Sequence, residues 1–216
     1  MHSAAHSPDH DTLYGGSALG GLWRGGLDGS DWTPIGDNLY GGAHWLAVNT
    51  GDDGDVVLAA TDWGAIHTTE DDGAIWTEPD GLGSPEEVRR VLTLTDGSEA
   101  TFLVLRRGDR TWVSRSTDGL ASFDEVADLG VFRGDLWAPR DGGGRLHLLT
   151  ADGVRTSDDQ GDTWSAATSL PAGDWTRGEL AASEDGAPTL YAVLSDADGR
   201  VLVRSDDAGE TWTTLQ

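Results

Sequence analysis

Two stretches near the C-terminus decide the fold: RSDDAGETW at Arg204–Trp212 and TSDDQGDTW at Thr156–Trp164. Both spell Ser-x-Asp-x-Gly-x-Thr-Trp, and their tryptophans stand 48 residues apart. Neither copy contains an obvious catalytic nucleophile. A word that is repeated at a fixed distance and lacks reactive groups indicates an element of architecture.

Three weaker copies of this word lie upstream. IHTTEDDGAIW keeps Thr69, Asp71, Gly73 and Trp76. VSRSTDGLASF keeps Ser116 and Asp118, moves the glycine to Gly119 and ends in Phe123. LWRGGLDGSDW keeps only Gly29 and Trp32. The closing aromatic residues are therefore 44, 47, 41 and 48 residues apart, and five units of about forty-three residues account for the chain.

Each unit has the same internal pattern of short apolar runs and turns. TLYAVLSDADGRVLVRS (Thr189–Ser205) shows it most clearly, with two strand-like runs around a glycine-containing break. One more run precedes such a pair, and the closing aromatic residue opens another. Four strands of about four to seven residues per unit predict an all-β chain. Four-stranded units of this length predict a β-propeller of five antiparallel blades.

We expect one domain over residues 1–216, with blades at about 1–40, 41–85, 86–130, 131–173 and 174–216. AAHSPDHDTLY (Ala4–Tyr14) aligns with AASEDGAPTLY (Ala181–Tyr191) without a gap, which sets the phase of the blades. No strand is left over to build a blade from both termini. Two assemblies stay open: a monomeric ring, or a larger ring made by two copies.

Composition excludes several classes of protein. The 216 residues hold 31 glycines and no cysteine, and 38 acidic side chains against 14 basic ones give a net charge of −24. Such a surface repels nucleic acid and acidic lipid, so we expect neither as a partner. All the basic residues are arginines, and this Lys-free acidic composition resembles that of proteins from salt-loving microorganisms. No signal peptide or transmembrane segment is apparent, which predicts a soluble protein that is cytoplasmic or exported with its signal removed.

The repeated word resembles the Asp-box, or BNR repeat, of sialidase-like propellers. The same repeat occurs in sortilin-type receptors, a photosystem II assembly factor and some glucan hydrolases. In that family the box joins the third and fourth strands of a blade, on the face opposite the binding centre. The resemblance therefore implies a structural role for the matching residues, which are Thr69, Asp71, Gly73, Trp76, Ser116, Asp118, Phe123, Ser157, Asp159, Gly161, Trp164, Ser205, Asp207, Gly209 and Trp212.

Physical chemistry agrees with that role. Ser205 and Asp207 can accept hydrogen bonds from backbone N–H groups inside their own turn, which fixes the turn without a metal. Gly209 permits a left-handed backbone where a β-carbon would clash. Trp212 then covers the hairpin, and burial of one tryptophan stabilises a fold by up to about 4–6 kcal/mol.

If the boxes lie on one face, a ligand site is expected at the opposite strand ends. These are the loops leading into each first strand and the loops between the second and third strands. Arginine pairs with carboxylates and tryptophan stacks on sugars, so these loops predict a site for a glycan or a small anion. The candidate ligand-binding residues are Tyr40, His44, Trp45, Trp63, Arg89, Arg90, Arg133, Asp135, Trp175, Arg177 and Glu179. Arg107 and Arg110 lie in the same class of loop. The alternative is that these arginines pair with nearby acids and these tryptophans fill gaps between blades.

No catalytic residue, metal ligand or cofactor is predicted. A sialidase would need an arginine triad, a Tyr–Glu nucleophile pair and an acid/base Asp, and the Arg-Ile-Pro signature of that family is absent. Tyr40 is the one tyrosine expected in a loop, and no pair of carboxylates is distinguished. The sequence thus predicts a non-enzymatic module that binds a protein or glycan ligand. The alternative is a glycoside hydrolase of exo-sialidase type.

Overall fold

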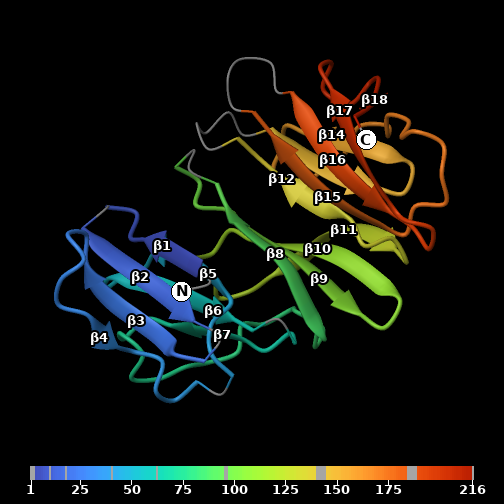
Figure 1. The fold of residues 1–216 in the computed structure, drawn as a ribbon. Helices are drawn as coiled ribbons and strands as arrows, with labels where there is room; N and C mark the ends of the chain where they lie inside the picture. Colours follow the sequence, from blue (N-terminus) through green and yellow to red (C-terminus); the bar gives the residue numbers. More distant parts are fainter. Residues whose placement is uncertain are drawn as a thin grey trace. The chain divides into compact units, whose positions relative to one another are not determined.

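The computed structural model describes residues 3–9, 11–17, 19–39, 41–61, 63–94, 97–139, 145–183 and 189–215. Within these ranges every regular element is a β-strand, as the sequence predicts. The strands form five antiparallel sheets of three or four strands (Figure 1). No helix in the described part of the chain is long and apolar enough to cross a membrane.

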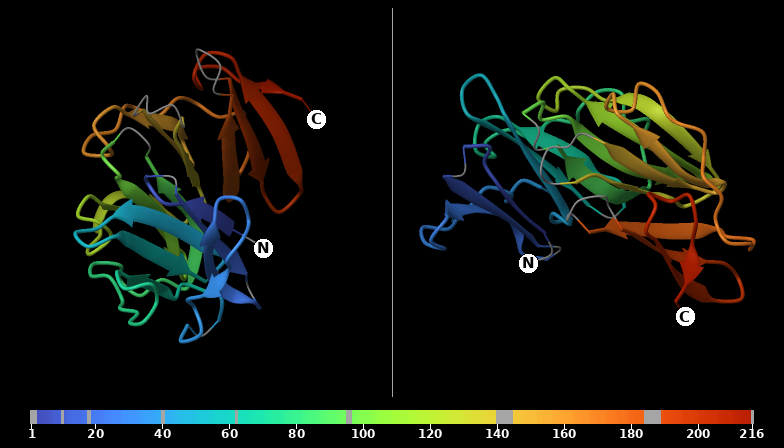
Figure 2. Two further views of the ribbon diagram at one scale, coloured as in Figure 1. Left: turned by 90° about the vertical axis from the view of Figure 1, so that its left-hand side faces the viewer. Right: turned by 90° about the horizontal axis from the view of Figure 1, so that it is seen from above.

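Strands follow one another across each sheet in chain order, and Figure 2 shows this meander from two further sides. The first sheet holds β1 (Ser3–His6), β2 (Thr12–Ser17), β3 (Gly21–Gly26) and β4 (Thr33–Pro34). The second holds β5 (Trp45–Thr50), β6 (Asp55–Ala60) and β7 (Ile66–Thr69). The third holds β8 (Glu87–Thr93), β9 (Thr101–Arg107), β10 (Arg110–Ser116) and β11 (Asp124–Gly130). The fourth holds β12 (Asp135–Trp137), β13 (Leu146–Thr150) and β14 (Gly153–Ser157). The fifth holds β15 (Arg177–Ala182), β16 (Leu190–Ser195), β17 (Arg200–Ser205) and β18 (Thr213–Thr214).

The prediction of four strands per unit holds for three sheets and is wrong for the second and fourth. In the second sheet only Thr77 pairs with β7, through Thr68, and Pro79 follows without an N–H to donate. In the fourth sheet Ser165 and Thr168 each donate an N–H to β14, yet the segment forms no continuous ladder. These fourth segments lie at sheet edges, where little packing enforces regular pairing.

The predicted gapless alignment of the first and last units is wrong by one residue in the first strand of each unit. Ala5 lies opposite Tyr14 in the first sheet, whereas Ala181 lies opposite Tyr191 in the fifth. The turn between the two strands is therefore one residue longer in the fifth sheet. Sequence similarity of AAHS with AASE hid this difference.

The chain divides into two compact units. The first takes in residues 1–93, 99–107 and 114–125, and the second takes in residues 94–98, 108–113 and 126–216. In the first unit, Tyr14, Leu22 and Ile35 of the first sheet are buried against Val48 and Val57 of the second. Apolar side chains at alternate strand positions point to one face, and this face forms the core.

Polar contacts also join the first two sheets. The Tyr14 hydroxyl donates to Asp55 at 2.7 Å, and Arg24 pairs with Asp72 at 2.7 Å. Burial, together with the Asp55 carboxylate, raises the pKa of Tyr14, so this tyrosine is a fixed donor at neutral pH. The first-to-second sheet interface is thus a buried apolar patch bordered by a tyrosine and an arginine that face acids.

In the second unit the core lies between the fourth and fifth sheets. Phe132, Leu149 and Val154 pack against side chains of the fifth sheet, including Leu180 and Leu190. A second cross-sheet contact comes from Asp135, which is 4% exposed. Its carboxylate accepts the N–H of Leu136 at 2.9 Å and of Leu180 at 3.0 Å.

The repeated turns share one hydrogen-bond pattern. In the fifth sheet Ser205 Oγ accepts the N–H of Gly209 at 2.8 Å and donates to Asp207 at 2.7 Å. Asp207 in turn accepts the N–H of Thr211 at 2.8 Å and its hydroxyl at 2.5 Å. The corresponding bonds recur in the other three turns that carry the word, which begin at Thr69, Ser116 and Ser157.

Two of the closing tryptophans donate a hydrogen bond to the sheet before them. Trp76 Nε1 donates to the carbonyl of Ile35 at 3.2 Å, and Trp164 Nε1 donates to that of Val126 at 3.1 Å. Each acceptor is the third residue after the preceding closing aromatic residue. By that count Trp212 would donate to Ala167, but its buried Nε1 has no partner among the described residues.

Candidate functional site

A pocket of about 410 Å³ opens at one end of the fifth sheet. It is lined by Arg177, Glu179, Val193, Ser195, Asp196, Ala197, Asp198, Gly199 and Arg200. Because β17 runs from Arg200 to Ser205, the pocket and the repeated turn occupy opposite ends of this strand. Within the fifth sheet, the pocket therefore lies at the end where the sequence predicts a ligand site.

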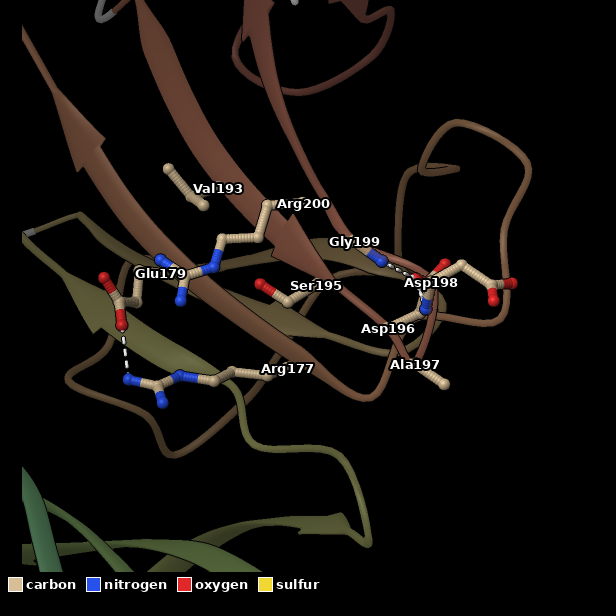
Figure 3. Close-up of a pocket in the computed structure, with 9 residues that line it drawn as sticks. All are labelled: Arg177, Glu179, Val193, Ser195, Asp196, Ala197, Asp198, Gly199 and Arg200. Carbon is tan, nitrogen blue, oxygen red and sulfur yellow. Dashed lines mark hydrogen bonds and ion pairs between the residues drawn. The ribbon is translucent and has the colours of Figure 1, made fainter.

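Strand register brings two arginines to one row across the sheet. Arg177 of β15 lies opposite Ser195 of β16, and Ser195 lies opposite Arg200 of β17. Glu179 and Val193 form the next row on the same face. In Figure 3, Ser195 lies between the two arginines, and both guanidinium groups extend to the side of the Glu179 carboxylate.

Charges in the pocket are only partly paired. Arg177 pairs with Glu179, and the two side chains are 46% and 55% exposed. Arg200 has no ion pair with any residue that the structure describes. The pocket thus offers one unpaired guanidinium group, a hydroxyl and a carboxylate that accepts hydrogen bonds.

The turn between β16 and β17 closes one side of the pocket. Asp196 Oδ1 accepts the N–H of Asp198 at 2.8 Å and of Gly199 at 2.9 Å, and Asp196 N–H donates to the Gly199 carbonyl. These bonds are those of an Asx-type turn. They hold Arg200 in place at the start of β17.

Three more of the residues that were predicted from sequence belong to the second unit and lie close to the start of β15, outside the pocket lining. Trp175 donates from Nε1 to the carbonyl of Pro171 at 2.8 Å and packs against the core. Arg133 forms backbone bonds around Arg177, accepting from Gly178 and donating to Thr176. Asp135 is buried in its contact with Leu180 and does not line the pocket.

In the first unit the predicted residues form a separate aromatic group. The His44 and Trp63 rings lie 6.3 Å apart at an angle of 56°, and Trp63 is 54% exposed. Trp45 instead donates to the carbonyl of Val88 at 3.1 Å, which fastens it to the third sheet. Tyr40 lies outside the described residues.

The arginines of the third sheet have partners close by. Arg89 is 6% exposed in its side chain and pairs with Glu87, and the β-bulge between Val88 and Arg90 includes it. Arg107 donates to the carbonyl of Gly83 at 3.4 Å. Arg110 pairs with Asp128 and lies over the Trp112 ring at 5.2 Å. These contacts match the alternative stated from sequence, in which arginines pair within the scaffold.

The sequence interpretation missed Ser195 and Arg200. Arg200 follows the loop between the second and third strands of its unit, which is one of the two loop classes expected to carry a site. The signal was present, because Arg107 and Arg110 were selected by the same rule in the third unit.

Among the described residues no group of three or more His, Asp or Glu side chains is placed to hold a metal ion.

Comparisons with known proteins identify the fold. No protein-family model matches the chain, and no curated protein matches it by sequence. Among solved structures, an ancestral GH74 enzyme matches 99% of this chain with a TM-score of 0.73 at 14% identity. YCF48 from Cyanidioschyzon merolae matches 94% with a TM-score of 0.57 at 16% identity, and the Dos1 propeller matches 100% with a TM-score of 0.58 at 15% identity.

The matches differ in how much of the other protein they cover. The chain spans 31% of the GH74 enzyme, 69% of YCF48 and 58% of the Dos1 propeller. At these identities the likeness concerns the fold alone. The structural neighbours of this all-β chain are β-propeller proteins.

Proposed function

We propose that the chain is a non-enzymatic Asp-box β-propeller module that binds a small acidic sugar in the pocket of the fifth sheet. The observation that carries the proposal is the row Arg177–Ser195–Arg200, in which Arg200 lacks an ion pair within the described residues. An unpaired guanidinium group binds a carboxylate through two parallel hydrogen bonds.

The rest of the pocket suits sugar hydroxyl groups. Glu179 accepts hydrogen bonds, and the Ser195 hydroxyl both donates and accepts. The volume of about 410 Å³ falls within the range of about 300–1,000 Å³ that is common for small-molecule sites. A ligand that carries one carboxylate and several hydroxyl groups would use every polar side chain of the row.

In this proposal the five sheets are the blades of one domain over residues 1–216, and the repeated turns are structural. Two observations support the assignment of the turns. Their hydroxyl and aspartate side chains are engaged in bonds within the turn, and Trp76 and Trp164 donate to the neighbouring sheet. These bonds support a scaffold role for the turns.

A glycoside hydrolase is the second candidate, favoured by the structural match to a GH74 enzyme. A glycosidase needs one carboxylic acid that donates a proton and one carboxylate. Three acids line the pocket, Glu179, Asp196 and Asp198. Glu179 accepts from Arg177 and Asp196 accepts two backbone N–H groups, so two of the three are engaged as carboxylates, and for that reason we favour binding over hydrolysis.

The test compares two probes that differ in one group, glucuronate and glucose. We expect glucuronate to raise the melting temperature and to bind at least about tenfold more tightly than glucose, a difference of about 1.4 kcal/mol. Arg200→Gln should remove this preference. The control is Arg145→Gln, which removes an exposed ion pair with Asp158 away from the pocket and should keep the preference. Equal binding of both probes, or release of a chromophore from aryl glucuronides or glucosides, would contradict the proposal.

A further inference from the structure

Charged side chains in the pocket of the fifth sheet are positioned by strand pairing within that one sheet. All nine residues that line the pocket belong to β15, β16, β17 or the turn between β16 and β17. Arg177 and Glu179 stand two positions apart on β15 and therefore share a face. Arg200 joins the row of Arg177 from β17, through Ser195. The place of each charge thus follows from contacts inside the second unit alone.

Acids outnumber bases in the lining of this pocket. It holds two arginines and three acids, Glu179, Asp196 and Asp198, which give a net charge of −1. The Asp196 carboxylate already accepts two backbone N–H groups of its own turn. In Figure 3 the Asp198 side chain points away from both guanidinium groups. Glu179 is therefore the acid that governs what the two arginines can bind.

The ion pair with Glu179 occupies Arg177. The two side chains are 46% and 55% exposed and lie on the same strand, so they pair without the ordering of any other segment. A ligand group that displaced Glu179 from Arg177 would place its own negative charge beside an unpaired carboxylate. Like charges at such short range repel, so Glu179 guards Arg177 against a second anionic group.

Arg200 remains as the guanidinium group that a ligand can use. It forms no ion pair with any residue that the structure describes. Its two parallel N–H groups match one carboxylate. A second negative charge on the same ligand would find no free guanidinium group in the lining and would lie close to Glu179.

We propose that Glu179 is the specificity-determining residue that limits the ligand to a single negative charge, an inference that rests on the function proposed above for this pocket. The ligand class is then a sugar acid with one carboxylate, and sugar phosphates and sugar diacids are rejected. Selection of this kind uses repulsion of the wrong ligand as well as attraction of the right one. The ligand carboxylate binds Arg200, while its hydroxyl groups bond to Ser195 and to the Glu179 oxygens.

Two probes that differ in charge test this limit: glucuronate, with one carboxylate, and glucose 6-phosphate. At about pH 8 the phosphate group carries two negative charges, because the second pKa of a phosphate monoester is about 6. Titration calorimetry is carried out in about 0.1 M salt, where the Debye length of about 10 Å leaves charges within the pocket only weakly screened. We expect the wild type to bind glucuronate at least about tenfold more tightly than glucose 6-phosphate.

Removal of the Glu179 charge should change the preferred ligand. Glu179→Gln releases Arg177, so two guanidinium groups can bind the phosphate, and the preference should move at least about tenfold toward glucose 6-phosphate. Glu179→Thr, whose side chain suits a strand, is a second variant with the same expected effect. Asp198→Asn is the matched control, because it also removes one charge from the lining but leaves the ion pair in place, and it should keep the preference of the wild type.

A double variant tests whether Glu179 acts through Arg177. Arg177→Gln combined with Glu179→Gln leaves Arg200 as the one arginine in the lining and restores its net charge of −1. The preference for glucuronate should therefore return. A double variant that keeps the preference of Glu179→Gln would show that Glu179 does not act through its ion pair, which contradicts the proposal.

The results distinguish the role of Glu179 from the function proposed for the pocket. If the wild type prefers glucuronate and both Glu179 variants, folded by circular dichroism, keep that preference, the role of Glu179 is overturned and the binding function stands. The same holds if Asp198→Asn changes the preference as much as Glu179→Gln does. If the wild type binds neither probe but Glu179→Gln binds glucose 6-phosphate, the sugar-acid function fails and the role of Glu179 is supported. A wild type that prefers glucose 6-phosphate, or a set of proteins that binds neither probe, overturns both.

Discussion

At the scale of single residues, His147 is the buried titratable group with the largest consequence for pH. It lies on β13, is 1% exposed, and its ring is 5.4 Å from that of Trp137. Its Nδ1 has no hydrogen-bond partner among the described residues. Burial, reinforced by the positive charge of Arg145, lowers the pKa of His147 to about 4.

Stability should therefore fall in mild acid through His147. The unfolded chain binds this proton near pH 6.5 and the folded chain only near pH 4, so stability is complete above pH 6.5 and declines as the pH falls toward 4. Between pH 7 and pH 5 the loss is on the order of 2 kcal/mol. Urea unfolding at the two pH values should show that His147→Phe removes this loss, while His67→Phe on β7 keeps it. An equal loss in all three proteins would contradict the assignment to His147.

Backbone conformation at the repeated turns is also a property of single residues. The fourth position is left-handed in every turn that carries the word, with φ of 55° at Asp72, 56° at Gln160 and 56° at Ala208. Only the fifth position was expected to need such a backbone. In the third turn Gly119 takes the fourth position, and Leu120 takes the fifth with φ of 73°.

Glycine substitutions at two such positions should have opposite effects. Ala208→Gly relieves left-handed strain and should stabilise the protein by about 0.5–1 kcal/mol. Leu120→Gly relieves the same strain but removes a side chain that is 0% exposed, and should destabilise by about 2–5 kcal/mol. Thermal unfolding of the two variants checks this, and destabilisation by Ala208→Gly would show that the turn is not strained there.

At the scale of elements, each repeated turn is held by a buried hydroxyl and an exposed carboxylate. Bonds from the Thr211 hydroxyl and N–H, and then from Ser205, lower the pKa of Asp207 to about 2. Similar bonds from Thr163 and Ser157 lower the pKa of Asp159 to about 2. These carboxylates support the fold above about pH 4, and their contribution is lost as the pH falls through about 2.

Removal of the Ser205 hydroxyl tests whether this hydroxyl stabilises the repeated turn of the fifth sheet. Ser205 is 1% exposed, and Ser205→Ala leaves the N–H of Gly209 buried without its acceptor. The expected loss is about 1–3 kcal/mol of unfolding free energy. Ser30→Ala, in the degenerate turn of the first sheet, should change stability by less than about 0.5 kcal/mol. If both variants lose the same unfolding free energy in chemical denaturation, the Ser205 hydroxyl does not stabilise its turn as claimed.

Strands and turns were predictable because their signals are local. The word at Ser205–Trp212 and the alternation in Thr189–Ser205 depend on residues that touch within one hairpin. The edge segments after Trp76 and Trp164 were not predictable, because strand pairing there depends on which N–H groups find a partner. The one-residue difference between Ala5 and Ala181 was hidden by the sequence similarity of the two segments.

At the scale of the whole molecule, charge is the dominant feature. A net charge of −24 on 216 residues opposes compaction, and each sheet adds acids at its turns. The site was less predictable than the sheets, because it depends on which loop residues the register places in one row. Arg177 and Glu179 were predicted from sequence, and the loop rule also covers Arg200, but only the pairing of β15, β16 and β17 shows that Ser195 and Arg200 share a row with Arg177.

Salt should stabilise the protein. Raising the salt concentration from about 0.01 M to about 1 M shortens the Debye length from about 30 Å to about 3 Å and screens the repulsion between acids. We expect a gain of at least about 1 kcal/mol, or about 2–4 °C in melting temperature. Scanning calorimetry with sodium chloride checks this. A melting temperature that falls with salt would mean that attractive ion pairs outweigh the repulsion.

The central claim is that the repeated acids hold the scaffold while recognition occurs at the other end of the fifth sheet. Titration calorimetry of glucuronate into the wild type, Asp207→Asn and Arg200→Gln tests it most directly. We predict that Asp207→Asn lowers thermal stability and binds glucuronate as the wild type does, whereas Arg200→Gln binds at least about tenfold more weakly. Loss of binding in Asp207→Asn, with wild-type affinity in Arg200→Gln, would contradict the claim.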